Sequence, residues 1–147
     1  YEDRPTVKAV IKKDGKILII NDGLLPGGGI DPGESNEEAL IRELQEEIGA
    51  TIKKLEKIGV VVQYRNLINR RYIVDGYVAE LETIGGPTNP QNEREAQFTM
   101  HWLSLEDART YVADSIEKSQ LTPHKDPISQ QSLLYNMMTT FEFLKAL

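Results

Sequence analysis

A glycine-rich loop that runs directly into a capped helix constrains this chain more than any other stretch. The loop reads Leu25-Pro26-Gly27-Gly28-Gly29, and Pro32-Gly33 follows shortly before the helix. Ser35 with Glu38 three residues later is the pattern of a capping box, and Gly49 is the residue type that commonly ends a helix. The spacing therefore predicts one helix between Ser35 and Gly49, entered from a loop with few side chains.

This helix has an acidic side and an apolar side. At about 100° per residue, Glu43, Glu46 and Glu47 fall within a wedge of roughly 100°. The neighbouring sector is predicted to face a core and contains Leu40, Ile41, Leu44 and Ile48. The three carboxylates repel one another, and a hard divalent cation such as Mg²⁺ would offset this repulsion. A solvated acidic surface is the plainer alternative for the acids taken alone.

The glycines before the helix favour a metal site over a solvated acidic surface. The run Gly27-Gly28-Gly29 lets backbone N–H groups approach an anion closely, as in loops that bind phosphate. A bare glycine run more often marks a turn. Its fixed position just before an acidic helix favours a metal-assisted phosphate site.

Gly28, Glu34, Arg42-Glu43-Leu44, Glu46-Glu47 and Gly49 stand at fixed spacings in this stretch. With these positions, the stretch Gly28–Ala50 resembles the Nudix box of the MutT-like Nudix hydrolases. The last position of the box usually carries a bulkier aliphatic residue than Ala50. The resemblance covers about a sixth of the chain.

The resemblance implies a pyrophosphohydrolase that cleaves a diphosphate linkage in a nucleoside diphosphate joined to a group X, such as a nucleoside triphosphate or a nucleotide sugar. It implies Mg²⁺ as cofactor, with Mn²⁺ as an alternative, and a small nucleotide as substrate. Two other functions stay open: a nucleotide-binding regulatory domain without turnover, and a Nudix-fold isomerase or hydrolase of capped RNA.

The resemblance also assigns roles by position in the box. Glu43, Glu46 and Glu47 would be catalytic metal ligands, and Arg42 would orient one of these carboxylates. Glu34 would be a supporting or metal-proximal acid, with a purely structural loop role as the alternative. Gly28 and Gly29 would shape the loop that binds the substrate.

The general base is not fixed by the box. Glu95 is the preferred candidate for a base or a further metal ligand, because the family often places an acid shortly before the strand that here holds Trp102. Glu93 is the second candidate, and two solvated loop acids are the alternative.

Arg71 and Tyr64 are the sequence candidates for further substrate contacts. Arg71 belongs to a basic group around one predicted turn, Arg65, Arg70 and Arg71, which could meet distal phosphates; a solvated hairpin end is the simpler interpretation. Tyr64 belongs to an aromatic group that could stack on a nucleobase, although each member is more often a core or surface residue. This group contains Tyr64, Tyr72, Tyr77 and Trp102.

The pattern along the rest of the chain, strands alternating with two or three helices, predicts an α/β sandwich. The resemblance implies one Nudix domain over residues 1–147, an α/β/α sandwich with a central mixed sheet. Strands are expected in a hairpin over Thr6–Ile20 that turns at Asp14-Gly15, over Ile52–Tyr64 with a bulge at Gly59, over Arg70–Leu81, and over Gln97–Leu103. A short helix is expected from Ser104 to about Ala113.

A C-terminal helix over about residues 127–147 is predicted to begin at Pro127. Its apolar stripe contains Leu134, Met137, Met138, Phe141 and Leu144. This stripe suits a core or a subunit contact, so a homodimer stays open.

Composition narrows the class of protein. The net charge of −6 argues against a surface that coats long nucleic acid. The absence of cysteine fits a reducing compartment, and no apolar run approaches the roughly 20 residues of a membrane helix, so we expect a cytoplasmic protein that does not bind membranes.

Overall fold

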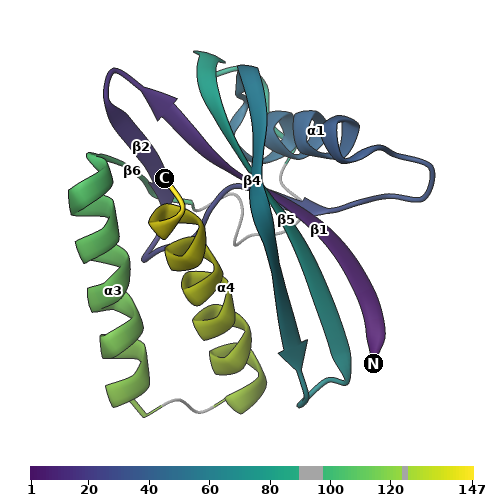
Figure 1. Cartoon of the computed structure of the whole chain (residues 1–147), viewed down its shortest axis with the longest axis vertical. Coiled ribbons are helices and arrows are strands. Elements are labelled where there is room, and N and C mark those ends of the chain that lie inside the picture. The colour runs from purple at the N-terminus through teal and green to yellow at the C-terminus, as the bar shows by residue number, and fades with distance from the viewer. Residues whose placement is uncertain (90–97, 124–125) are drawn as a thin grey trace.

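The computed structural model describes residues 1–89, 98–123 and 126–147, and it has a mixed sheet between two helical layers (Figure 1). The strands are β1 (Glu2–Lys13), β2 (Lys16–Ile20), β3 (Gly27–Gly29), β4 (Thr51–Arg65), β5 (Arg70–Thr83) and β6 (Met100–Leu103). The helices are α1 (Asn36–Ile48), α3 (Leu105–Leu121) and α4 (Pro127–Lys145). The strand order is β4-β5-β1-β2-β6, with β3 paired to β1. Because β1 and β5 are parallel and the other pairs antiparallel, the predicted α/β sandwich with a central mixed sheet is confirmed.

The hairpin of β1 and β2 follows from its turn residues. Asp14 and Gly15 have φ values of 51° and 75°, as a two-residue turn with positive φ at both positions requires. Lys13 and Lys16 pair across this turn. The strand before the turn is longer than expected, because β1 begins at Glu2 rather than at Thr6.

β1 is the strand on which both core layers pack. Val7, Ala9 and Ile11 belong to the cluster under α1, whereas Val10 belongs to the cluster under α3 and α4. Figure 1 shows α1 on one side of the sheet and the pair of α3 and α4 on the other. A strand covered on both faces is therefore at the centre of the molecule.

α1 has the ends that the sequence predicts. The Oγ of Ser35 accepts a hydrogen bond from the Glu38 N–H at 3.1 Å, and the Glu38 carboxylate accepts one from the Ser35 N–H at 3.2 Å. Gly49 closes the helix in the left-handed conformation, with φ of 61°. The capping box and the C-terminal glycine thus fix the position of the acidic residues along the chain.

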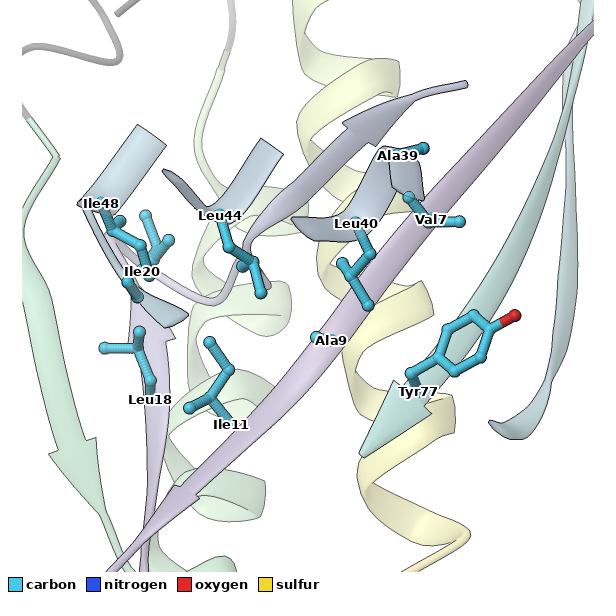
Figure 2. Close-up of a cluster of buried hydrophobic side chains, with 11 residues drawn as sticks. Val7, Ala9, Ile11, Leu18, Ile20, Ala39, Leu40, Leu44, Ile48 and Tyr77 are labelled. Carbon is cyan, nitrogen blue, oxygen red and sulfur yellow. The ribbon is translucent and has the colours of Figure 1, made fainter. Parts of the chain in front are cut away.

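The buried face of α1 differs from the prediction at one residue. Leu40, Leu44 and Ile48 point into the core beside the strands (Figure 2). Ile41 is 58% exposed, so the expectation that it faces the core is wrong. Ala39 is buried instead and belongs to the same cluster as Leu40, Leu44 and Ile48.

The long hairpin of β4 and β5 also follows the sequence. The pairing shifts register between Lys57 and Gly59, which confirms an irregularity at the expected bulge. The chain turns at residues 66–69 and returns in β5. β6 is described from Met100, and Gln97, where this strand was expected to begin, lies outside the described residues.

The two last helices correct two expectations. α3 extends to Leu121 and does not end near Ala113, because Ile116 continues the face that packs against α4. In α4, Met138 is 44% exposed while Phe143 is 2% exposed, so the predicted stripe is wrong at these positions. α4 packs against both the sheet and α3, and its buried residues therefore do not follow a single stripe. None of the described helices is long and apolar enough to cross a membrane.

Candidate active site

The glycine loop lies directly against the acidic helix. β3 pairs antiparallel with β1 from Thr6 to Lys8, which holds the loop in place. A Cβ added at Gly28 would lie 2.5 Å from Cδ of Glu43. Gly27 has a φ of 141°, a conformation that residues with a side chain rarely adopt. Only glycines therefore allow the backbone to approach the Glu43 carboxylate this closely.

Arg42 joins the acids of the loop to those of the helix. Its Nε and Nη2 donate to the two oxygens of Glu34 at 2.8 and 2.9 Å. Its Nη1 donates to Glu43 Oε1 at 3.0 Å and to Glu46 Oε2 at 3.3 Å. Nη2 also donates to the Gly29 carbonyl at 3.0 Å. One guanidinium therefore orients two of the predicted metal ligands and anchors the loop.

Glu34 is held as an anion. The hydrogen bonds from Arg42 and from the Asp31 N–H lower its pKa from 4.5 to about 2. Because Arg42 contacts both of its oxygens, the arrangement favours a supporting role for Glu34 over direct metal binding.

Glu43 has the opposite electrostatic environment. Its side chain is 12% exposed, and burial raises its pKa above the usual range. Arg42 opposes this rise, whereas the neighbouring Glu46 carboxylate adds to it. A cation bound beside Glu43 would stabilise its charged form.

Glu47 connects the helix to the other side of the loop. Its Oε1 accepts a hydrogen bond from the Gly27 N–H at 2.8 Å. Glu47, Lys8 and Asn136 line a small cavity of about 50 Å³. Lys8 also donates from Nζ to the Leu25 carbonyl at 3.3 Å, so a fixed ammonium group lies near the acids.

The acidic set suits a hard cation, although Glu43, Glu46 and Glu47 do not form a ready-made cage. Within residues 1–89, 98–123 and 126–147, no group of three acids or histidines lies together as a metal site. Glu43 and Glu46 converge on one cationic nitrogen of Arg42, which shows that positive charge is accommodated between them. Carboxylate oxygens are the donors that Mg²⁺ prefers.

The segment after β5 is attached to the end of α1. The Gly86 N–H donates to the Gly49 carbonyl at 3.0 Å, and the Asn89 N–H donates to the Glu46 carbonyl at 2.8 Å. The chain thus leaves its described part beside a predicted metal ligand. Glu93 and Glu95 lie outside the described residues.

The two sequence candidates for further substrate contacts lie elsewhere. Arg71 donates from Nε and Nη2 to Asp3 at 2.8 Å each. Tyr64 is 52% exposed and contacts the ring of Tyr1 at 5.5 Å between centroids. Neither residue lines the cavity that borders Gly28 and Gly29.

The lining of this cavity matches the residues named from sequence only in part. The cavity has a volume of about 620 Å³ and is bordered by Gly28, Gly29, Lys8, Arg65, Tyr72 and Asn136, among others. Arg65 and Tyr72 belong to the basic and aromatic groups named from sequence, but Arg71 and Tyr64 were preferred; each lies one position away, and alternation along a strand places neighbours on opposite faces. Lys8 and Asn136 were not named as site residues. Lys8 had a sequence signal, because it interrupts the apolar run of β1.

Comparisons with known proteins agree with this geometry. A model of the NUDIX domain matches residues 3–125. A putative 8-oxo-dGTP diphosphatase, YtkD, of Bacillus subtilis is 42% identical over 60 residues, which cover 40% of this chain and 36% of that protein. An ADP-ribose pyrophosphatase of Methanocaldococcus jannaschii is 34% identical over 101 residues, covering 63% of this chain and 59% of that protein. The chain thus matches between about a third and three fifths of the length of these two relatives.

Solved structures show the same fold. A NUDIX hydrolase from Nitrosomonas europaea superposes with a TM-score of 0.63 at 19% identity, over 96% of this chain and 89% of that one. The E. coli ORF135 protein superposes with a TM-score of 0.54 at 26% identity, over 94% and 90% of the two chains. With a domain model matched over most of its length and the box residues gathered at one site, this chain belongs to the NUDIX domain family.

Proposed function

We propose that this chain is a divalent-metal-dependent pyrophosphohydrolase that cleaves the diphosphate linkage of a nucleoside diphosphate joined to a group X. The observation that carries the proposal is the contact of Gly28 with the Glu43 carboxylate, beside the network of Arg42. This arrangement combines backbone that can approach phosphate with oxygen donors for a hard cation.

Glu43, Glu46 and Glu47 would hold Mg²⁺, with Mn²⁺ as the alternative. A bound divalent ion lowers the pKa of water and neutralises charge on phosphate oxygens. Arg42 keeps the carboxylates of Glu43 and Glu46 oriented, and Glu34 in turn fixes Arg42. Gly28 and Gly29 keep the loop free of side chains where the diphosphate would bind.

We assign the general base to Glu95, with Glu93 as the second candidate. The support is the position of Asn89, the last described residue before both acids in the sequence, whose N–H donates to the Glu46 carbonyl at 2.8 Å.

The substrate class is a small nucleotide. The names of relatives include 8-oxo-dGTP, ADP-ribose and CTP as the compounds on which they act. The net charge of −6 disfavours long RNA, although one relative is named as an RNA pyrophosphohydrolase. Binding without turnover is the second candidate, because the described acids do not form a ready metal group.

A substrate panel with and without metal tests the proposal. Release of phosphate from 8-oxo-dGTP, CTP, ADP-ribose and nucleotide sugars would be measured through a coupled pyrophosphatase or phosphatase, in Mg²⁺ and in EDTA. We expect metal-dependent cleavage of one class, and a loss of at least about 100-fold in Glu46→Gln and Glu47→Gln, since even residues that only support metal ligands cost 10- to 100-fold.

The control is Glu37→Gln, an exposed acid in the first turn of the same helix, which should retain full activity. The same panel applied to Glu95→Gln and Glu93→Gln assigns the base. Binding of nucleotides without cleavage of any compound would replace this proposal with the regulatory-domain function.

A further inference from the structure

Arg65 is a buried cation surrounded by neutral acceptors. The residue is 6% exposed. Its Nε donates to Gln63 Oε1 at 2.9 Å, Nη1 to Ser132 Oγ at 2.7 Å, and Nη2 to Asn136 Oδ1 at 3.1 Å. No carboxylate of the described residues forms an ion pair with it. A buried charge without an opposite charge is costly, so the arrangement needs an explanation.

The guanidinium is held in one orientation and retains free donors. It lies over the ring of Tyr72, 3.8 Å from the centroid. Nη1 and Nη2 each carry a second N–H that has no partner among the described residues. Burial is the main cause that lowers the pKa of Arg65; Tyr72 opposes this shift and Arg70 adds to it.

Asn136 lines the same cavity as Arg65 and is hydrogen-bonded to it. Because arginine only donates, the atom of Asn136 that faces Arg65 must be the amide oxygen, which also accepts from Gln63 Nε2 at 3.1 Å. The amide nitrogen of Asn136 therefore points away from Arg65, and Asn136 borders the cavity of about 620 Å³.

The charges that border this cavity are mainly positive. Arg4, Lys8 and Arg65 supply the cations. The acids of the lining are Asp3 and Asp31, which pair with Arg71 and Arg42, residues outside the lining. Arg4 in turn pairs through Nη2 with Glu2, outside the lining, at 3.0 Å, while its buried Nε has no hydrogen-bond partner in the described structure. Lys8 and Arg65 are therefore the cations of the lining without an ion-pair partner among the described residues. A protein with a net charge of −6 thus has a cationic cavity next to its glycine loop.

Resting on the proposed function, we infer that Arg65 and Asn136 form a subsite for a second anionic group of the substrate, a phosphate monoester separate from the scissile diphosphate. An anion would balance the charge of Arg65 and take its two free N–H groups, whereas a neutral carbonyl would leave the charge unbalanced. Gly28 and Gly29 border the same cavity, so one ligand can reach both places.

Matched pairs of ligands test this subsite. Dissociation constants would be measured by calorimetry in EDTA for coenzyme A against 3′-dephospho-coenzyme A, and for NADPH against NADH. We expect the member with the extra phosphate to bind about 10- to 100-fold more tightly in at least one pair, as a charge-assisted hydrogen-bond pair implies. Equal affinity within both pairs overturns the inference.

Variants of Arg65 and of its neighbour Arg70 distinguish anion binding by Arg65 from a purely structural role of this residue. Arg65→Gln should abolish the preference for the extra phosphate and leave the affinity for the other member of the pair unchanged. Arg70→Gln is the control, because it removes the same charge from the cross-strand neighbour of Arg65 outside the cavity lining, and it should keep the preference.

If Arg65→Gln does not fold, Asn136→Asp provides a second test of the subsite. The substitution keeps the oxygen that accepts from Arg65 and Gln63 and gives Arg65 an internal counter-charge, so the fold should remain and the preference should disappear. A folded Asn136→Asp that retains the preference contradicts the inference. Because binding is measured without turnover, failure of the pyrophosphohydrolase proposal and failure of this subsite give different results.

Discussion

Arg42 decides how the acidic residues of the box can coexist. Without it, Glu34, Glu43 and Glu46 would be carboxylates close together in a partly dry environment. The guanidinium binds all three and separates their behaviour, because it lowers the pKa of Glu34 strongly while burial keeps that of Glu43 raised. Glu34 is therefore held as an anion by Arg42, whereas the charge of Glu43 would be stabilised by a cation bound beside it.

The pair of Glu34 and Arg42 makes stability depend on acid pH. The pKa of Glu34 is about 2 in the folded protein against the ordinary 4.5, so its contribution is complete above pH 4.5 and is lost as the pH falls toward 2. The difference in free energy of unfolding between the wild type and Glu34→Gln should thus be constant above this range and shrink below it. Urea denaturation between neutral pH and about pH 3 measures it. A difference that stays constant over the whole range would show that Arg42 does not hold Glu34.

At the scale of elements, the capping and turn residues of the sequence correctly predicted the ends of α1 and the turn between β1 and β2. Ser35, Gly49, Asp14 and Gly15 act through their own backbone and their nearest neighbours, and the elements that they bound lie where expected. The true end of α3 was not predictable in this way, because it depends on packing against a helix that begins after residue 126.

The face of α4 shows the same limit. Thr139 and Thr140 are buried although they are polar, because their hydroxyls donate to the carbonyls of Tyr135 and Asn136 one turn earlier. A stripe predicted from apolar residues alone omits these two threonines and includes Met138, which is exposed. Only the docking of α4 on two neighbours at once reveals which residues are buried.

Phe143 provides the stability test for this packing. It is 2% exposed and its ring lies against Gly76, where any side chain would clash with it. Phe143→Ala should lower the free energy of unfolding by about 3–5 kcal/mol, the range for a truncated buried aromatic residue. Phe141→Ala, at a partly exposed position of the same helix, is the control and should cost clearly less. Equal losses of unfolding free energy in the two variants, measured by chemical denaturation, would mean that Phe143 is no more deeply packed than Phe141.

At the scale of the whole molecule, the candidate site combines residues of both helical layers with a residue of the strand between them. Glu47 of α1, Asn136 of α4 and Lys8 of β1 line one cavity. The box predicted the contribution of α1, because its residues are close in sequence. The contribution of α4 could not be predicted, since Arg65 and Asn136 are 71 residues apart and meet only when α4 docks.

Metal binding should therefore stabilise the whole fold and not only the loop. A ligand that binds only the native state at about 100 times its Kd adds about 2.7 kcal/mol, which for a chain of this size raises the Tm by several degrees. We expect Mg²⁺ or Mn²⁺ to produce this rise in a thermal unfolding experiment, and Glu46→Gln to lose most of it. Because a protein with a net charge of −6 also attracts cations without a specific site, Glu37→Gln serves as the matched control and should keep the full rise. If Glu46→Gln and Glu37→Gln respond equally, the metal acts through the general surface charge, and the carboxylates of α1 do not bind it.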